Sequence, residues 1–531
     1  MRPFTKVALC AQLLAWTSPF ALAQIESADN ATMPISQFKT RPHTWAPALD
    51  VNQTGPVVPG YIFLAPYQSP GTGAYIYDKF GNLIFDGFGT IGSANAHDFK
   101  VCSYKGTDHL CVTQVNQEMG YGMGMGLIFD NNYRAVTSVQ TGNDALPADM
   151  HEFQLLSDGR GGNTAIMTSY RTIPYDMSYF NITTGQGWLS EGLFQEVDVK
   201  TGEVLFEWYS TNHVDPSATI IPINGTDVSG DGLTPYTGFD YFHINSIDKS
   251  AATGHYLVSA RHTSTIYYIN RTDESIIWQM SYKGHSDFQL TNFNFSYQHD
   301  ARILAESQTG MTISMFDNAN NCAESTSTES SGRIIAIDYN AGTATQTAQT
   351  LPPDNLSSCS QGNTQILSNG GIFHGWGSNP WISEHDSNGN IVLAGNFSVT
   401  GALAMNYRAY SFPWTSVPSY TKPAVYSYAL NSSSPTEIYV SWNGATEVRT
   451  WRFWGADEIG DAFVELGNAT WAGFETQWTA PKYQNWVMAE AIAGDGTSLK
   501  TSSYTQTFVP SGSLAQSCDS VGCSVATSYS S

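Results

Sequence analysis

Charged residues are scarce in this sequence of 531 residues, and basic residues are the scarcest of them. Only 13% of the chain is charged, and 23 lysines and arginines stand against 46 aspartates and glutamates, so the formal net charge is −23 at pH 7. Nucleic acid and anionic membrane surfaces are poor partners for such a chain, because they carry the same sign of charge. An anionic substrate would have to bind in a local cationic pocket.

Long apolar runs and helical patterns are also missing. After the N-terminal stretch, no segment is long and uncharged enough to span a membrane, and no sustained helical periodicity is present. The sequence has no glycine-rich phosphate loop before a helix, no Gly-x-Ser-x-Gly elbow and no zinc-protease motif, and no cofactor is expected. Its 13% of aromatic residues favours a β-rich protein instead.

Residues 1–23 have the pattern of a secretory signal peptide, so the protein is expected to be secreted. Arg2 and Lys6 precede an apolar stretch at 7–16, and Ala21-Leu22-Ala23, with small residues at its first and third positions, suits a cleavage site. Ten Asn-x-Ser/Thr sequons predict N-glycosylation, as in other secreted proteins. They lie at Asn30, Asn52, Asn181, Asn224, Asn270, Asn294, Asn355, Asn396, Asn431 and Asn468.

Cysteine is rare, but its number suits an oxidising compartment. Cys10 lies in the predicted signal peptide, which leaves six cysteines to pair. Many connectivities are possible, and pairing between nearest neighbours is preferred. The preferred disulfides are Cys102–Cys111, Cys322–Cys359 and Cys518–Cys523.

A short apolar alternation followed by Asp or Asn, a turn and a second apolar strand recurs along the chain. It occurs at 74–85, 127–133, 196–208, 267–278 and 335–342. The spacing of about 50 to 70 residues is typical of repeat architectures. We therefore expect an all-β fold, a roughly six-bladed β-propeller whose first and last segments share strands to close the ring.

The chain after the signal peptide divides into four segments. Residues 24–55 are polar and irregular and are expected to form an arm over the main body. Residues 56–420 contain the repeats, and residues 421–509 contain alternating strands typical of an immunoglobulin- or fibronectin-like β-sandwich. The Ser-rich tail at 510–531 is expected to be flexible. A long insert at 211–238 is expected to form a rim beside the site.

A second recurring pattern places a histidine at the start of a predicted hairpin. It occurs at His97, His151, His243, His299 and His385. Equivalent positions of a closed ring face its axis together, so we expect these side chains to converge. The hairpin that His243 opens ends in Arg261, which adds a permanent positive charge.

His151, His243, Arg261 and His299 together favour a pocket for a tetrahedral oxyanion in transfer. A guanidinium offers a planar fork to such oxygens, and an imidazole can donate to them, move a proton or act as a nucleophile. A single histidine at a strand end is more often structural, but five in register are harder to explain in that way. A zinc or copper site is ranked lower because Arg261 would repel a cation, so no metal is expected. His262 is expected to point to the opposite face of its strand.

These motifs resemble the arylsulfate sulfotransferases, in the secreted fungal branch described as arylsulfotransferase-like. The resemblance spans about 61–414 and rests on four motifs. They are His151-Glu-Phe-Gln-Leu-Leu-Ser-Asp-Gly, His243-Ile-Asn-Ser-Ile, Ser259-Ala-Arg-His-Thr-Ser and Gln298-His-Asp-Ala-Arg. It implies a six-bladed propeller that moves a sulfuryl group between aryl sulfates and phenols through a sulfated histidine, without an adenosine-phosphosulfate donor.

The resemblance makes His299 the nucleophile, with His151, His243 and Arg261 binding and polarising the sulfuryl oxygens. His97, His385 and Arg302 are weaker candidates for contacts to a small phenolic substrate. Two alternatives stay open. The same pocket could serve an acid–base cyclase or isomerase of phenolic fungal secondary metabolites, or the protein could be a glycan-binding propeller without catalytic activity.

Overall fold

A computed structural model of the chain describes residues 34–69, 71–89, 95–117, 120–157, 159, 161–223, 229–398 and 403–524. The predicted signal peptide and the sequons Asn30 and Asn224 lie outside these residues. Within them, regular structure consists of strands and five short 3-10 helices. None of the described helices is long and apolar enough to cross a membrane.

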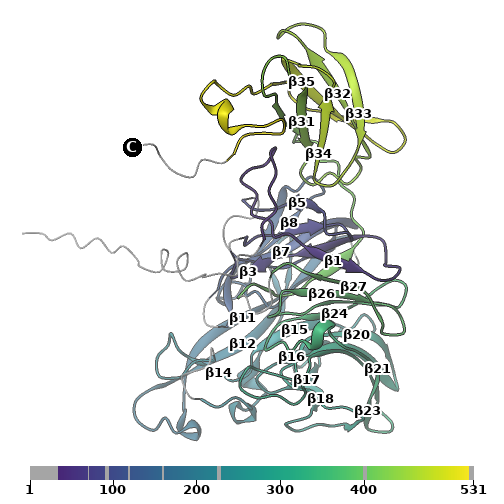
Figure 1. The fold of residues 1–531 in the computed structure, drawn as a ribbon. Helices are drawn as coiled ribbons and strands as arrows, with labels where there is room; N and C mark the ends of the chain where they lie inside the picture. The colour runs from purple at the N-terminus through teal and green to yellow at the C-terminus, as the bar shows by residue number, and fades with distance from the viewer. Residues whose placement is uncertain are drawn as a thin grey trace, which may run out of the picture.

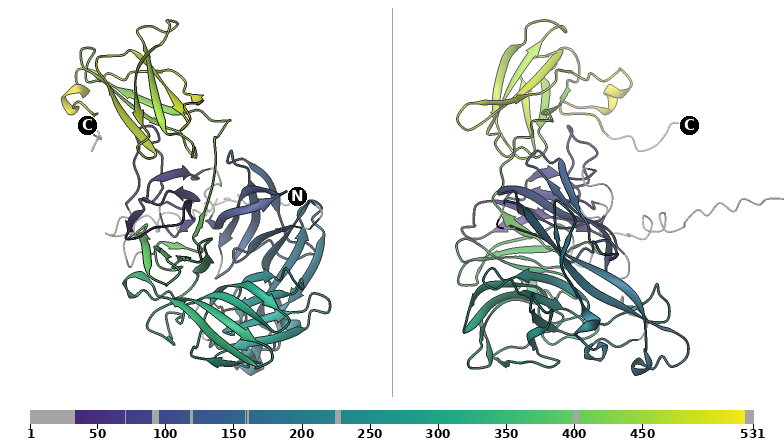
Figure 2. Two further views of the ribbon diagram at one scale, coloured as in Figure 1. Left: turned by 90° about the vertical axis from the view of Figure 1, so that its right-hand side faces the viewer. Right: turned by 180° about the vertical axis from the view of Figure 1, so that it is seen from behind.

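Six mainly antiparallel sheets follow one another around a ring and form a six-bladed β-propeller, as predicted (Figure 1; Figure 2, left). Blade 1 contains β6 (Asn95–Tyr104), β7 (Thr107–Gln117), β8 (Gly122–Phe129) and β9 (Ala135–Val139). Blade 2 contains β10 (Phe153–Ser157), β11 (Asn163–Tyr175), β12 (Gly187–Asp198) and β13 (Val204–Tyr209), with β14 (Phe239–Asp240) parallel to β12. Blade 3 contains β15 (Ile244–Lys249), β16 (Tyr256–Ala260), β17 (Thr265–Ile269) and β18 (Ile276–Ser281).

Blades 5 and 6 each recruit a strand from elsewhere in the chain, and blade 4 adds the strand just before its own first strand. Blade 4 contains β20 (His299–Ser307), β21 (Gly310–Asp317), β22 (Ser331–Asp338) and β23 (Thr343–Thr350), with β19 (Gln289–Thr291) parallel to β23. Blade 5 contains β24 (Asn363–Ile366), β25 (Ile372–Gly375), β26 (Trp381–His385), β27 (Ile391–Asn396) and the early strand β1 (Asp50–Gln53). Blade 6 contains β29 (Tyr410–Phe412), β2 (Tyr61–Leu64), β4 (Tyr75–Tyr77) and β5 (Leu83–Asp86).

Blade 6 closes the ring, because its innermost strand comes from the other end of the propeller sequence. β29 pairs antiparallel with β2, with Tyr61 opposite Phe412. A small two-stranded sheet of β3 (Pro66–Tyr67) and β28 (Met405–Asn406) adds a second link between the same two segments. The predicted sharing of strands between the first and last segments is therefore observed.

The recurring Asp or Asn motif forms the turn between the two outer strands of every blade. Its side-chain oxygen accepts hydrogen bonds from backbone amides two to four residues further on, so that local hydrogen bonds alone stabilise a tight turn. The six residues are Asp78, Asp130, Asp198, Asn270, Asp338 and Asp386. The sixth member, Asp386, follows His385 and shows that this histidine belongs to the turn motif.

Apolar side chains pack between each pair of neighbouring blades rather than in one central core. Phe99 and Ile76 belong to the cluster between blades 1 and 6, for example, and Trp208 and Tyr267 to the cluster between blades 2 and 3. Similar clusters fill the other four blade interfaces. This arrangement leaves the axis to the residues of the innermost strands.

The C-terminal β-sandwich stands outside the ring (Figure 1). One sheet contains β30 (Ala424–Tyr428), β31 (Thr436–Ser441) and β34 (Glu475–Ala480), and the other contains β32 (Thr450–Ala456), β33 (Val464–Thr470), β35 (Trp486–Ile492), β36 (Ser498–Thr501) and β37 (Thr505–Gln506). Tyr133 of the propeller donates a hydrogen bond to the carbonyl of Gly444 at 2.7 Å, and Asn443 pairs with the backbone of Asp86. The domain boundaries at 56, 420 and 509 stay predictions.

Two segments are more regular than the sequence analysis expected. The arm at 24–55 contains β1, which pairs with β27 and completes blade 5. The described part of the tail contains the 3-10 helix η5 (Leu514–Ser517), and the carbonyls of Asp519 and Val521 accept hydrogen bonds from Tyr428 and Tyr439 of the sandwich. These contacts hold the tail on the sandwich, so it is not a free segment as far as residue 524.

The three preferred disulfides are all present. Cys102–Cys111 joins β6 to β7, Cys322–Cys359 links the loops after β21 and before β24, and Cys518–Cys523 closes the loop after η5. Eight sequons lie among the described residues, and none of their asparagines is buried. Glycosylation stays a prediction.

Candidate functional site

One residue at the start of each innermost strand contributes to a layer across the propeller axis, which we call the histidine layer. Its members are His97, His151, His243, His299, Gln361 and Tyr407. The Tyr407 ring lies among them, with its centroid 5.4, 6.2 and 6.5 Å from those of His151, His97 and His299. The His151 and His243 rings are 4.8 Å apart. Four of the five predicted histidines therefore converge.

His151 and His243 are each paired with a buried carboxylate. Nδ1 of His151 lies 2.5 Å from Oδ2 of Asp149, and Nδ1 of His243 lies 2.6 Å from Oδ2 of Asp240. The same carboxylates accept the backbone amides of the histidines, which fixes both rings. This geometry places the proton on Nδ1 and directs Nε2 to the other side of each ring, where it is available to a ligand.

His299 is paired with an amide instead of a carboxylate. Its Nδ1 donates to Oδ1 of Asn318 at 2.7 Å. The amide orientation of Asn318 is fixed, because Nδ2 donates to the carbonyls of Ser358 and Gln361. Nε2 of His299 accepts a hydrogen bond from the Gln361 amide at 3.1 Å, so its lone pair lies on Nε2.

Arg261 follows β16 directly and lies beside His243, as the hairpin predicts. Its backbone amide donates to the carbonyl of His243, Nη1 donates to Nε2 of His262 at 2.6 Å, and Nη2 donates to the carbonyl of Cys359. The disulfide loop of blade 4 thus helps to hold the guanidinium plane. Arg261 is 6% exposed, so its charge acts in a poorly solvated environment.

The expectation that His262 points away from the site is wrong. β16 ends at Ala260, and the chain turns at 261–264, so strand alternation no longer applies at this position. The His262 ring stacks on His243 at 4.4 Å, donates from Nδ1 to the Asp240 carbonyl and accepts from Arg261 at Nε2. It thereby orients both His243 and Arg261.

His97 has an unusual environment within the histidine layer. The residue is fully buried, and neither ring nitrogen has a hydrogen-bond partner among the described residues. Its ring packs edge-on against Tyr67 at 4.5 Å. Buried polar atoms without partners are rare in native proteins and often mark a place where a ligand or water binds.

Burial shifts the pKa values of three histidines of this layer towards the neutral imidazole. It lowers the pKa of His97 to about 3, with a further contribution from His151. Burial, with Arg261 as a further cause, also holds the pKa values of His243 and His299 well below their usual range. Burial raises the pKa of Asp240. At neutral pH the permanent positive charge of the site is therefore that of Arg261.

Asp240, His243 and His262 offer ligand atoms within 4.8 Å of one another, which could suit a metal ion. Nδ1 of His243 is hydrogen-bonded to the Asp240 carboxylate, Nδ1 of His262 donates to the Asp240 backbone carbonyl, and the Arg261 guanidinium donates directly to His262. A cation among them would lie beside a fixed positive charge, so the arrangement suits an anion better.

Two predicted substrate contacts lie away from the histidine layer. His385 ends β26, the third strand of blade 5, and its ring nitrogens lie 3.0 Å from Ser383 Oγ and 3.2 Å from the carbonyl of Gly389. It belongs to the outer turn motif and has a structural role. Arg302 lies three residues after His299 and forms ion pairs with Glu152 and Asp300.

A second layer lies directly beyond the histidine layer, because the next residue of four innermost strands is charged. This charged layer contains Asp98, Glu152, Asp300 and Arg408, none of them more than 3% exposed. Nη1 of Arg408 is 3.2 Å from Asp98 and 3.4 Å from Glu152. Lys100 and Arg302 complete the ion pairs on the side away from the histidines.

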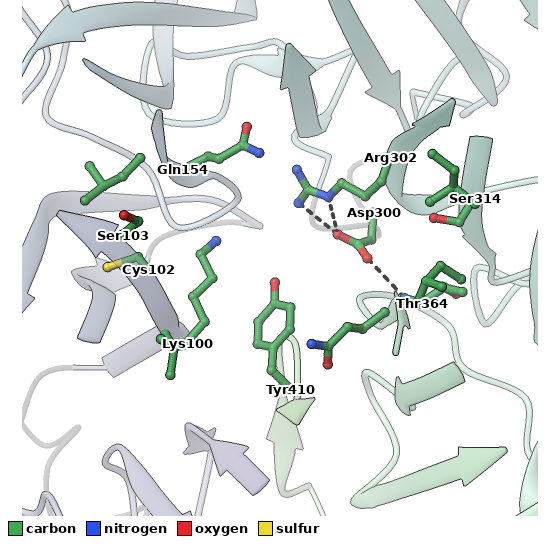
Figure 3. A pocket seen from close by; sticks show the side chains of 14 residues that line it. Lys100, Cys102, Ser103, Gln154, Asp300, Arg302, Ser314, Thr364 and Tyr410 are labelled. Atoms are coloured by element: carbon green, nitrogen blue, oxygen red, sulfur yellow. Dashed lines mark hydrogen bonds and ion pairs between the residues drawn. The ribbon is translucent and has the colours of Figure 1, made fainter. Parts of the chain in front are cut away.

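A cavity of about 430 Å³ lies beyond the charged layer (Figure 3). Lys100, Gln154, Arg302 and Tyr410 project into it, and Asp300 forms part of its wall. Aromatic rings lie beside the histidine layer instead, with Tyr121 stacked on Tyr170 next to His151. The insert at 211–238 contacts the site, as expected of a rim, where the Ile220 backbone amide donates to the His262 carbonyl.

Several residues of the site were not predicted from the sequence. Asp149 and Asp240 stand two and three residues before a layer histidine, a spacing that could have identified them. Asn318 follows β21 directly, Gln361 precedes β24, and Tyr407 precedes β29. No local pattern connects these three to His299.

The axis of this six-bladed propeller thus brings together two carboxylate-paired histidines, an amide-paired histidine and a buried arginine. Over residues 105–398, more than half of the chain, the sequence matches the family model described as arylsulfotransferase (ASST). The chain belongs to the arylsulfotransferase family.

Other comparisons show only distant likenesses. No curated protein matches the sequence. A protein of unknown function from Bacteroides caccae is 12% identical, with 67% of this chain and 99% of that chain covered and a TM-score of 0.37. The β-propeller domain of Cps50 (Swd1) from Myceliophteria thermophila is 10% identical, with 61% and 98% covered and a TM-score of 0.33. Neither bears on the function.

Proposed function

We propose that the protein transfers a sulfuryl group from an aryl sulfate to a phenol, through a sulfated histidine at the propeller axis. The observation that carries the proposal is the convergence of His151, His243, Arg261 and His299 from three blades. These groups supply one fixed positive charge, two acid–base pairs and one neutral imidazole, which together suit transfer of an anionic group. Membership of the arylsulfotransferase family supports the same chemistry.

His299 is the nucleophile in this proposal, and Nε2 is the attacking atom. Asn318 keeps the proton on Nδ1, and an amide partner, unlike a carboxylate, does not favour a second proton on the ring. Nε2 gives up its hydrogen bond with the Gln361 amide and attacks sulfur. The sulfur–oxygen bond to the donor phenol breaks, and a sulfur–nitrogen bond forms.

Arg261 and His243 hold the sulfuryl oxygens, and His151 moves the proton. A bound sulfate ester brings negative charge, which favours protonation of Nε2 on the carboxylate-paired rings. Protonated His151 then donates to the leaving phenolate in the first half-reaction. Neutral His151 takes the proton of the acceptor phenol in the second half-reaction, when sulfur returns to oxygen and His299 is released. His97 provides unpaired nitrogens for a phenol hydroxyl.

The test is a transfer assay on the purified full chain with an aryl sulfate donor and a phenol acceptor. We expect sulfated acceptor from the wild type and a loss of about four orders of magnitude in His299→Ala. Persistent transfer in this variant excludes His299 as nucleophile. Donor-independent turnover of a phenol, with no sulfuryl transfer, would instead support the cyclase or isomerase alternative.

A further inference from the structure

The charged layer separates the histidine layer from a water-accessible cavity by the thickness of one residue. His299 and Asp300 are consecutive, yet His299 belongs to the site and Asp300 forms part of the cavity wall. Glu152, the residue after His151, lies directly behind the cavity wall, because it forms an ion pair with Arg302, which lines the cavity. A cavity of about 430 Å³ can hold on the order of ten water molecules.

The charges of this layer are balanced once the two adjacent cations, Lys100 and Arg302, are included. Asp98, Glu152 and Asp300 carry three negative charges, and Lys100, Arg302 and Arg408 carry three positive charges. Burial opposes ionisation of Asp98 and Glu152, but the neighbouring cations together hold both pKa values below the usual range. The layer therefore stays fully ion-paired at neutral pH and attracts no anion of its own.

Arg408 occupies the centre of the layer and seals it. The side chain is fully buried, and Nη2 also donates to the carbonyl of Asn245 at 2.8 Å. Tyr410 adds a hydrogen bond to Asp98 at 2.8 Å from the cavity side. A buried network in which each member has a partner is rigid, because breaking any pair exposes an unpaired charge.

We propose that the charged layer is a floor that keeps cavity water from the sulfated histidine and so makes the protein a transferase rather than a sulfatase. This inference rests on the proposed function. In transfer, the sulfur–nitrogen bond of sulfated His299 breaks as a phenol oxygen attacks and the phenol proton passes to His151. In hydrolysis a water oxygen attacks instead, and the products are free His299 and hydrogen sulfate, with the second water proton taken up by His151.

The test compares two substitutions of Glu152, a residue outside the proposed catalytic groups. Glu152→Ala opens a gap in the floor, whereas Glu152→Gln has nearly the same size and leaves it closed. Donor and acceptor are supplied at saturating concentrations to the full chain, and the ratio of free sulfate to sulfated acceptor is measured. Unfolded protein contributes to neither product, so a loss of stability does not change this ratio.

We expect the ratio to rise about tenfold or more in Glu152→Ala and less than about twofold in Glu152→Gln. If Glu152→Ala yields no folded protein, Arg408→Lys replaces it, because a shorter cation leaves a gap while keeping the charge. An unchanged ratio in a gap variant that still transfers overturns the inference and leaves the proposed function intact. A wild type that makes no sulfated acceptor and releases no phenol overturns the proposed function itself.

Discussion

The two layers of the propeller axis are formed by consecutive residues of the same strands, yet they differ in how their polar groups are satisfied. In the histidine layer, His97 has two unpaired ring nitrogens, and the hydrogen bonds of His151 and His243 run through Nδ1. In the charged layer, Arg408 and its neighbours are joined by ion pairs throughout. Both layers are almost fully buried.

Consecutive residues of one innermost strand thus have different roles, one suited to function and the next to stability. Buried groups that lack partners reduce stability unless a ligand satisfies them, so the histidine layer is suited to a substrate. Buried charges that are all paired contribute rigidity, and removing one partner is costly. Substitutions in the charged layer should therefore lower the free energy of unfolding more than substitutions in the histidine layer.

The largest effect on stability is expected from Arg408→Met. It leaves Asp98 and Glu152 buried with fewer counter-charges, so we expect the free energy of unfolding to fall by about 3–5 kcal/mol. Chemical denaturation followed by fluorescence measures it. The matched control is Arg271→Met at an exposed position, which should change stability by no more than about 0.5 kcal/mol. Equal effects of the two substitutions would contradict the proposed role of the charged layer.

A smaller, pH-dependent effect is expected from His97→Leu. The native ring stays neutral down to a pKa of about 3, whereas the unfolded chain binds a proton below about pH 6.5. The wild type therefore loses stability from this group as the pH falls through 6.5. The free energy of unfolding of His97→Leu, relative to wild type, should rise by about 2 kcal/mol between pH 7 and pH 5.

Denaturation curves at the two pH values measure this difference. His285→Leu is the control, because the His285 side chain is 70% exposed, whereas His97 is fully buried. If the two substitutions have the same pH dependence, His97 is not held neutral by burial.

The smallest effect is expected from Asn318→Asp, which replaces the amide partner of His299 by a carboxylate, the kind of partner that His151 and His243 have. A carboxylate beside Nδ1 raises the pKa of His299, so the neutral nucleophile becomes populated only at higher pH. We expect transfer at pH 7 to fall about tenfold and the pH optimum to move upward. Asp240→Asn makes the reverse exchange at His243 and should weaken donor binding. Two variants with the wild-type pH–rate profile would refute this division of roles.

Much of the fold could be predicted from the sequence, because the propeller repeats its local chemistry. The Asp or Asn turns and the histidine hairpins are both short-range patterns, and the disulfides join neighbouring cysteines. His385 was misassigned because its Asp386 turn resembles the sequence after an inner-strand histidine, although it joins two outer strands. Position within a blade depends on pairing partners that local sequence does not contain.

The site was predictable only in part for the same reason. His151, His243 and Arg261 lie in continuous motifs, whereas Asn318 and Arg408 reach the axis through ring closure and pairing between distant strands. His262 was misplaced because strand alternation was extended one residue beyond the end of β16. Arginine is usually an exposed residue, and no local sequence pattern indicates that Arg408 is buried among three acidic side chains.

The most direct test of the account is to trap the covalent intermediate. The full chain is incubated with an aryl sulfate in the absence of acceptor. The reaction is quenched under alkaline conditions, which preserve the sulfur–nitrogen bond of a sulfated histidine. The protein is then analysed by intact mass and peptide mapping. The account predicts one added sulfuryl group, located on His299 and absent from His299→Ala. A sulfuryl group on another residue, or release of phenol and transfer to acceptor with no modified protein at any time, would contradict it.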